Sequence, residues 1–473
     1  MIIDIKQKET CVQVSYTNPK GSISLMDIPL PEGGYMNWQI CDDTDPDADP
    51  VIKNWKNESV KKVPGKKFED LNLHEFLQVR APEEYRELLH QFNKPNPFSV
   101  DIETEITDDA MPDAETAPNK ILSIQITAPN MASIVLSLKK CNMDNAMKIV
   151  NEEMKKWGKK YKFIARQIVF DTEKDMLEYF CTKVRDIFHV IIGWNYKGYD
   201  NIYIKNRCKK LGINYNICSP TQELDRDGCP LHRIIIDYME LYKEQSSSEV
   251  FSLKLDNIAE HELGMHKLSY DKTLRELYRD DIDRFVAYGI VDTILVQLLH
   301  KKLNFTDLGY NMAYYCGISY KAAGKQISQT DALIFKKFWK KGLVYADPRK
   351  DYEKKKYPGA FVKDPVTHEV DFPSCYDAKS LYPSTALTLY ISPDNYLGKC
   401  KKEEVTKLRK EGYVVTDRLS VYKPNPDAIF QEMWRDLRLE RDIYKATMFA
   451  IWQRVESKIE DEAKRRGLSL KDE

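Results

Sequence analysis

Apolar and polar residues alternate through Phe98-Ser99-Val100-Asp101-Ile102-Glu103. This period of two predicts a β-strand with one buried face. Asp101 and Glu103 are two residues apart, so both carboxylates project from the same face of that strand. The same Asp-x-Glu spacing recurs at residues 113–115 and 171–173 in apparent loops. The apolar surroundings, and not the spacing, therefore make the first pair a candidate site.

Further strands and helices are expected around this stretch. Residues 121–127, 190–194 and 234–236 have the apolar character of strands, and the second of these has the length of a buried one. Helices are expected at about residues 283–300, where apolar side chains form one stripe, and at about 427–464. Strands that alternate with amphipathic helices predict an α/β unit. One more strand is expected near residues 373–378.

Two further acidic residues lie where they can meet the first pair. Asp200 follows Asn195-Tyr196-Lys197-Gly198-Tyr199, which leaves the apolar strand and leads into a helical run. Tyr288 and Asp292 are four residues apart on the expected helix, so they share one face. We expect these side chains to converge on the Asp-x-Glu pair.

Four converging carboxylates suit hydrolysis of a phosphodiester. Two divalent ions about 4 Å apart generate the nucleophile and absorb charge on the phosphate, and hard ions such as Mg²⁺ prefer oxygen ligands. We expect two Mg²⁺ ions, with Mn²⁺ as a substitute. Their ligands would be Asp101, Glu103, Asp200 and Asp292. Tyr288 would orient the attacking water or the scissile phosphate.

Each position alone also has a structural explanation. The strand pair would suit a solvent-facing edge, Asp200 a helix cap and Tyr288 the rim of an amphipathic helix. Taken together, their order along strand, strand end and helix resembles the three exonuclease motifs of the DEDD superfamily in its Tyr-containing form. The resemblance implies an RNase H-like 3′→5′ exonuclease.

A second resemblance, to motif A of family B DNA polymerases, lies in Tyr376-Asp377-Ala378-Lys379-Ser380-Leu381-Tyr382-Pro383-Ser384. It implies that Asp377 ends a strand as a catalytic metal ligand. The backbone N–H groups of Ser380, Leu381 and Tyr382 would face triphosphate oxygens. Tyr382 would also pack under the incoming sugar, where a 2′-hydroxyl would clash. The alternative is a strand-to-helix turn with an ordinary buried tyrosine.

A third stretch, Tyr357-Pro358-Gly359-Ala360-Phe361-Val362, resembles the Tyr-x-Gly-Gly/Ala element that joins exonuclease to palm and steadies the template. Tyr357 and Gly359 are therefore expected to contact DNA, and the resemblance extends this role to Asn195.

Three basic residues fit the same family. Arg441 and Lys445 match the fingers pattern Arg-x-x-x-Lys that contacts the triphosphate, whereas a solvated helix face explains the same charges. Lys267 matches a lysine element of the exonuclease, and a surface lysine is the alternative.

The sequences of these motifs most resemble those of the replicative polymerases of T-even-type bacteriophages, and the resemblance covers residues 95–466. The resemblance implies an α/β and α+β multidomain chain that acts on DNA primer–template and single-stranded 3′ ends with dNTPs. The expected segments are 1–94 (N-terminal domain), 95–310 (exonuclease domain), 311–355 (return to the N-terminal domain and linker), 356–425 (N-terminal part of the palm with motif A) and 426–473 (first fingers helix and polar tail).

Two polymerase motifs do not occur in the 473 residues: motif B, Lys-x-x-x-Asn-Ser-x-Tyr-Gly, and motif C, Tyr-Gly-Asp-Thr-Asp-Ser. Motif C supplies the second metal-binding carboxylate of polymerisation. A second polypeptide is therefore expected to carry both motifs and to share the polymerase-site ions, as in a split polymerase; the alternative is a fragment of a longer chain. The alternatives are a stand-alone exonuclease with a vestigial palm and a non-catalytic primer–template-binding subunit. Binding to a sliding clamp stays open.

Bulk composition narrows the class of protein only in part. The formal net charge is −1, so the overall charge gives no support for nucleic-acid binding. No apolar run is long enough to span a membrane. Ten cysteines without a Cys-x-x-Cys pair indicate reduced thiols in a cytoplasm, that of the bacterial host if the chain is phage-encoded. His261 and His266 are five residues apart and leave a common helix face, which argues against zinc.

Overall fold

The computed structural model describes most of the chain. The described residues are 1–8, 10–29, 36–54, 59–64, 83–89, 91–107, 111–158, 163–246, 250–271, 273–341, 343–344, 362–365, 367–369, 371–372, 374 and 376–466. They divide into two compact units, residues 1–32 with 68–329 and residues 33–67 with 330–473. The five segments expected from the sequence stay a prediction.

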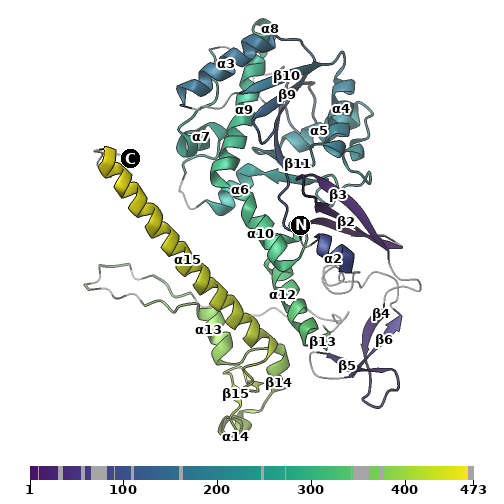
Figure 1. Ribbon diagram of the computed structural model, residues 1–473, viewed down its shortest axis with the longest axis vertical. Helices are drawn as coiled ribbons and strands as arrows, with labels where there is room; N and C mark the ends of the chain where they lie inside the picture. Colours follow the sequence, from purple (N-terminus) through teal and green to yellow (C-terminus); the bar gives the residue numbers. More distant parts are fainter. Residues whose placement is uncertain are drawn as a thin grey trace. The chain divides into compact units, whose positions relative to one another are not determined.

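A six-stranded mixed sheet forms the centre of the first unit (Figure 1). Its strands are β7 (Pro97–Thr104), β8 (Ile121–Thr127), β9 (Ala132–Ser137), β10 (Ile164–Val169), β11 (Val190–Gly193) and β12 (Ile234–Asp237). Their order is β10-β9-β8-β7-β11-β12. β8 is antiparallel to β7 and β9, and the other neighbouring pairs are parallel. The strands expected at 98–103, 121–127, 190–194 and 234–236 are confirmed.

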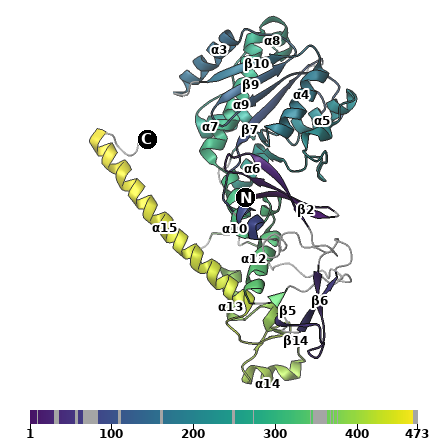
Figure 2. The same cartoon turned by 45° about the vertical axis from the view of Figure 1, so that its right-hand side comes forward.

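Helices cover both faces of this sheet (Figure 2). One face packs against α3 (Met143–Lys156), α7 (Leu255–Leu263), α8 (Leu274–Asp280) and α9 (Ile282–Leu303). The other packs against α4 (Glu173–Asp186), α5 (Asp200–Lys210) and the short helix η3 (Tyr215–Cys218). Another helix, α6 (Tyr238–Gln245), follows β12 directly. The mixed α/β class expected from the sequence is confirmed.

The alternation in β7 decides which side chains face which layer. Val100 and Ile102 join the core under α4 and α5, so the residues between them face α9. Asp101 and Glu103 therefore project toward the longest helix of this unit. That helix is buried from Phe285 to Leu299, because it lies across the strands rather than on their rim.

A smaller antiparallel sheet precedes the central one. It consists of β1 (Ile2–Gln7), β2 (Cys11–Thr17) and β3 (Ile23–Pro29). Four further helices precede or follow the layers of the central sheet along the chain: α2 (Glu83–Leu89), α10 (Thr306–Cys316), α11 (Tyr320–Ala323) and α12 (Gln326–Lys340).

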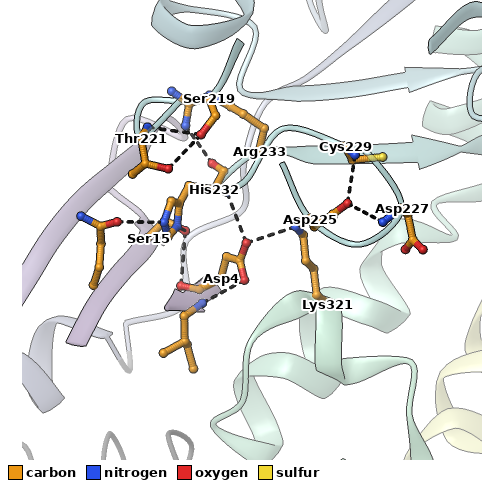
Figure 3. A network of polar contacts seen from close by, with 12 residues as sticks. Asp4, Ser15, Ser219, Thr221, Asp225, Asp227, Cys229, His232, Arg233 and Lys321 are labelled. Atoms are coloured by element: carbon orange, nitrogen blue, oxygen red, sulfur yellow. Dashed lines mark hydrogen bonds and ion pairs between the residues drawn. The ribbon is translucent and has the colours of Figure 1, made fainter. Parts of the chain in front are cut away.

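Polar contacts join this smaller sheet to a loop before β12 and to α11 (Figure 3). The buried ring of His232 bonds to Ser15 Oγ at 3.1 Å through Nδ1 and to Gln13 Oε1 at 3.2 Å through Nε2. The His232 backbone N–H donates to Asp4 Oδ2 at 3.2 Å. Lys321 Nζ reaches Asp4 at 3.1 Å and Asp225 at 2.9 Å. Three segments distant in sequence are thereby held together.

Acid is expected to weaken this junction through His232. Burial lowers the pKa of His232 to about 4, against the opposing charge of Asp4, and Lys321 and Arg233 add to the shift. The unfolded chain, with a histidine pKa near 6.5, therefore binds a proton that the folded chain refuses as the pH falls from about 6.5 toward 4. Wild type should lose about 2 kcal/mol more unfolding free energy between pH 7 and pH 5 than His232→Asn. Asparagine tolerates the positive φ of 61° at this position.

The measurement is a pair of urea unfolding series at the two pH values. His189 and His300 also have lowered pKa values, but they are present in both proteins and cancel in the comparison. Equal pH dependence for wild type and His232→Asn would show that this ring titrates alike in the folded and unfolded chains.

The second unit has two small sheets and a long helix. The first sheet has the order β13-β5-β6-β4, with β4 (Met36–Ile40), β5 (Ala48–Asn54), β6 (Ser59–Pro64) and β13 (Leu343–Val344). The second is β14-β16-β15, with β14 (Tyr396–Lys399), β15 (Val414–Val415) and β16 (Ser420–Tyr422). The helices are α13 (Leu381–Thr388), α14 (Val405–Lys410), α15 (Ile429–Arg466) and the short η4 (Pro393–Asn395) and η5 (Lys402–Glu404).

The expected long C-terminal helix is confirmed as α15, but the strand expected at residues 373–378 is not found. Tyr376, Asp377 and Ala378 lie in irregular chain directly before α13, and Pro373 and Cys375 lie outside the described residues. A strand needs a neighbour to satisfy its backbone N–H and C=O groups. None of the strands described in this unit pairs with residues 376–378. Across the described residues, no helix has the length and apolar character to cross a membrane.

Candidate active site

Three carboxylates from two elements meet at one end of the central sheet. Oxygens of Asp101 and Glu103 on β7 and of Asp292 on α9 lie within 4.8 Å of one another. Glu103 and Asp292 are buried. Among the described residues this is the only group of three or more His, Cys, Asp or Glu side chains that are placed to share a metal ion.

Hydrogen bonds and one glycine fix α9 against the strands. Ser99 Oγ donates to the Thr293 carbonyl at 2.8 Å, and Thr293 Oγ1 bonds to Thr127 Oγ1 at 2.8 Å. At Gly289 a Cβ atom would lie 2.5 Å from the Gln125 side chain. Glycine therefore permits the close approach that brings Asp292, one turn further on, to the Asp-x-Glu pair.

Asp200 lies beside the same strand, β7, although it belongs to α5. It is buried at the first turn of α5, and its Oδ1 accepts the backbone N–H of Ile102 at 3.1 Å. Asp200 thus lies against the backbone between Asp101 and Glu103, although it is not one of the three carboxylates within 4.8 Å. The Asp200 carboxylate is therefore a neighbour of the three-carboxylate group, and it does not serve only as a cap of α5 away from that group.

A lysine and two tyrosines surround Asp292. Lys267 Nζ donates to Asp292 Oδ2 at 2.6 Å and to the Tyr288 hydroxyl at 3.1 Å. The Lys267 backbone N–H is held by Asp256 Oδ1 at 2.7 Å. The ring of Tyr270 packs edge-on against Tyr288, with 5.3 Å between centroids. Lys267 is therefore a residue of this site, and the surface-lysine alternative is wrong.

The carboxylates resist ionisation when no cation is bound. Burial raises the pKa of Asp101 to about 7, with the charge of Asp292 adding and that of Lys267 opposing. Burial, followed by the charge of Asp101, raises the pKa of Glu103 and of Asp200 well above their ordinary values. Burial also raises the pKa of Asp292, and Lys267 opposes that shift. A bound cation would reverse these shifts, because it favours the charged forms.

The donor set fits a hard divalent ion. Every candidate ligand atom is a carboxylate oxygen, the kind that Mg²⁺ prefers. Asp292 Oδ1 is buried and has no hydrogen-bond partner. An unpartnered buried carboxylate oxygen beside two other carboxylates is explained by a metal ligand role.

Asp237 is a buried residue of this region that the sequence analysis missed. Its Oδ1 accepts the Asn195 N–H at 3.1 Å and its Oδ2 the Lys197 N–H at 3.0 Å. The sequence contains a signal for this residue. Asp237 directly follows the apolar residues 234–236, just as the turn that leads to Asp200 follows the apolar residues 190–194. Asn195 itself begins the turn that leads to Asp200, and its φ is positive, at 59°.

The polymerase-like stretch lies in the second unit. Asp377 and Tyr376 are exposed, and Tyr382 is 81% exposed, which excludes the ordinary buried tyrosine. Ser380 precedes α13 with a positive φ of 55°, and Leu381 begins that helix. A turn between irregular chain and helix is therefore present, although its strand is not.

The two triphosphate residues expected on α15 lie near this turn. Lys379 Nζ is 3.5 Å from Asp442 Oδ2, and Asp442 directly follows Arg441. Arg441 and Lys445 are both exposed. The proposed template residues Tyr357 and Gly359 lie outside the described residues.

Comparison with known proteins identifies the first unit. The family model of the DNA polymerase family B exonuclease domain matches residues 78–258. The DNA-directed DNA polymerase of Escherichia phage RB69 is 30% identical over 291 residues, which cover 58% of this chain and 32% of that protein. The enzyme of Enterobacteria phage T4 is 28% identical over 307 residues, 59% of this chain and 34% of that protein.

A more distant relative points the same way. The DNA polymerase of Archaeoglobus fulgidus is 24% identical over 260 residues, 52% of this chain and 31% of that protein. The matched chain spans about a third of the length of these relatives. These matches agree with the carboxylate site: residues 78–258 match the exonuclease domain of family B DNA polymerases, and the chain is similar to the DNA polymerases of the RB69 and T4 phages.

Proposed function

We propose that this chain contains an RNase H-like 3′→5′ exonuclease that removes nucleotides from single-stranded DNA with divalent metal ions. The observation that carries the proposal is the approach of Asp101, Glu103 and Asp292 to within 4.8 Å beside the Lys267 ammonium. The family B exonuclease match over residues 78–258 supports it.

In this proposal the carboxylates hold two Mg²⁺ ions, which Mn²⁺ can replace. Asp101, Glu103 and Asp292 would be ligands, and Asp200, beside the Ile102 backbone, would complete the set. Bound ions supply a metal-activated water and neutralise charge on the phosphate. Tyr288, whose hydroxyl accepts a hydrogen bond from Lys267, would keep its own O–H for the scissile phosphate or the attacking water.

The direct test uses a single-stranded oligonucleotide with a 5′ label. The chain should shorten it one nucleotide at a time from the 3′ end in Mg²⁺, and a chelator should stop the reaction. Digestion that begins at the 5′ end, or that continues in the chelator, would refute the proposal.

The second unit would contribute part of a DNA-directed DNA polymerase. Asp377 would hold a polymerase-site ion, and Ser380, Leu381 and Tyr382 would contact the incoming dNTP. Arg441 and Lys445 on α15 would bind its triphosphate, which agrees with the 3.5 Å contact between Lys379 and the neighbouring Asp442. Asn195, Tyr357 and Gly359 would contact the primer–template.

Motifs B and C, which do not occur in these 473 residues, would come from a second polypeptide, as in a split polymerase. The apolar side chains of α15 support a partner on that helix. Met433 packs with Ile334 and Phe338 of α12. Further along α15, the apolar side chains that are more than half exposed are Leu439, Ile443, Tyr444, Met448, Phe449, Ile451 and Trp452. The reaction would take place in a bacterial host cytoplasm, with a sliding clamp as a further partner.

Replacement of Tyr382 with alanine should weaken sugar discrimination in the reconstituted polymerase. If the ring underlies the incoming sugar, its removal leaves room for a 2′-hydroxyl. The ratio of kcat/KM for dNTP to that for the matching ribonucleotide should fall by 10-fold or more, about 1.4 kcal/mol or more of lost discrimination. Tyr376→Ala, also on an exposed tyrosine, is the matched control. An unchanged ratio in Tyr382→Ala would mean that Tyr382 does not select the sugar.

A further inference from the structure

Beyond the metal ligands, the site depends on how the chain enters α5. Asp200 is the first residue of that helix, and the residue before it, Tyr199, gives no side-chain cap to the helix N-terminus. The entry is set instead by the turn at residues 195–199. There the Tyr199 N–H donates to the Asn195 carbonyl at 2.9 Å.

The turn is itself held from the neighbouring strand. Asp237 ends β12, next to Gly193 of β11 in the sheet register. Its two carboxylate oxygens accept the N–H groups of Asn195 and Lys197 at 3.1 and 3.0 Å. Backbone N–H groups arranged in this way form an anion-binding concavity, and here the anion is a side chain 40 residues away.

Asp237 also fixes its own position. Its Oδ1 accepts the N–H groups of Met239 and Glu240, so it caps α6. The side chain is 3% exposed, so solvent cannot easily take over its bonds. One carboxylate therefore ties together the end of β12, the start of α6 and the turn before Asp200.

We propose that Asp237 is a positioning residue of the exonuclease site, which fixes the turn at 195–199 and through it the carboxylate of Asp200. This rests on the proposed exonuclease function. Asp237 need not touch substrate or metal. Its effect runs through the turn to Asp200, whose Oδ1 is then held on the Ile102 N–H at 3.1 Å.

The two substitutions of Asp237 should differ. Asp237→Ala leaves the N–H groups of Asn195 and Lys197 without their acceptor. Asp237→Asn keeps one oxygen for Asn195 and for the α6 cap, but turns an NH₂ group toward the Lys197 N–H. The asparagine variant should therefore fold stably and still loosen the turn, with effects between those of wild type and alanine.

The matched control is Thr172→Ala. Thr172 caps α4 in the same unit by accepting the Asp175 N–H at 3.1 Å, so its loss removes a helix cap without touching the turn. Thermal unfolding of the variants shows how much of any effect is general destabilisation.

Three readouts on the full chain test the proposal. Hydrogen exchange of peptides spanning residues 194–201 should speed up in Asp237→Ala and Asp237→Asn, but not in Thr172→Ala. Mn²⁺ affinity and kcat for single-stranded DNA should each fall about 10- to 100-fold in Asp237→Ala, as for other groups that orient metal ligands. KM for DNA should change less than kcat, because Asp237 does not itself contact the substrate and acts on it only through Asn195 of the turn that it holds.

The outcomes separate this proposal from the proposed function. A wild-type chain that does not digest DNA contradicts the exonuclease, and hydrogen exchange and Mn²⁺ affinity then decide the role of Asp237 alone. Unchanged exchange at the turn in Asp237→Ala overturns the proposal. So does faster exchange with wild-type Mn²⁺ affinity, or an equal loss of affinity in Thr172→Ala.

Discussion

Asp101→Ala and Asp292→Ala are each expected to reduce 3′→5′ digestion of single-stranded DNA to the level seen without metal. Both residues supply oxygens to the same 4.8 Å group, and a hydrolysis that depends on two ions cannot proceed when either ion loses its ligands. The assay is the release of nucleotides from labelled DNA at saturating Mg²⁺. Asp171→Ala is the control, because it has the same Asp-x-Glu spacing but is exposed.

Asp101→Ala and Asp292→Ala should differ in melting temperature when metal is absent. Two unit charges 4 Å apart repel by about 4 kcal/mol at an effective dielectric near 20. At a pH above about 7, where Asp101 ionises beside Asp292 despite its raised pKa, loss of Asp101 relieves part of this repulsion, so the metal-free melting temperature should rise. Loss of Asp292 removes the partner of Lys267 at 2.6 Å, so no rise is expected. Digestion at the wild-type rate by either variant would refute the assignment of the site.

Primer extension is expected to be absent with this chain alone and to appear when a polypeptide carrying Tyr-Gly-Asp-Thr-Asp-Ser is added. In the proposed function Asp377 would give only one of the carboxylates that a two-ion transfer needs. The added chain should cover the exposed apolar part of α15 in an interface above roughly 2,000 Å², as permanent complexes do. Extension would be followed on a primed template with dNTPs.

Two variants sharpen that experiment. Replacing Tyr444 and Met448, which are 70% and 58% exposed, with serine should weaken assembly and extension together. Asp101→Ala should leave extension intact, since the exonuclease carboxylates lie in the other unit. The split-polymerase proposal would be contradicted if this chain extends a primer by itself, or if a stable complex with the second polypeptide shows no primer extension.

The sequence predicted the central sheet well because its periodicity is strong. The alternation at residues 98–103 places Val100 and Ile102 in one core and Asp101 and Glu103 on the opposite face. The helix at 283–300 is also clear from its apolar stripe. These local patterns survive folding because both faces of β7 are covered.

Other features depend on contacts that no local pattern reveals. Lys267 could not be told from a surface lysine, because its bond to Asp292 joins residues 25 apart through the fold. Asp237 is linked to Lys197 in the same way across 40 residues. The strand expected at 373–378 failed for the converse reason: its residues suit a strand, but pairing needs a neighbour that the described chain does not offer.

The most direct test of the metal-dependent exonuclease is a crystal structure of the full chain soaked in Mn²⁺, with data collected at an energy where manganese scatters anomalously. The account predicts anomalous peaks between the carboxylate oxygens of Asp101, Glu103 and Asp292, where Asp292 Oδ1 now lacks a partner. Manganese bound elsewhere on the chain, with no peak at these three carboxylates, would contradict it.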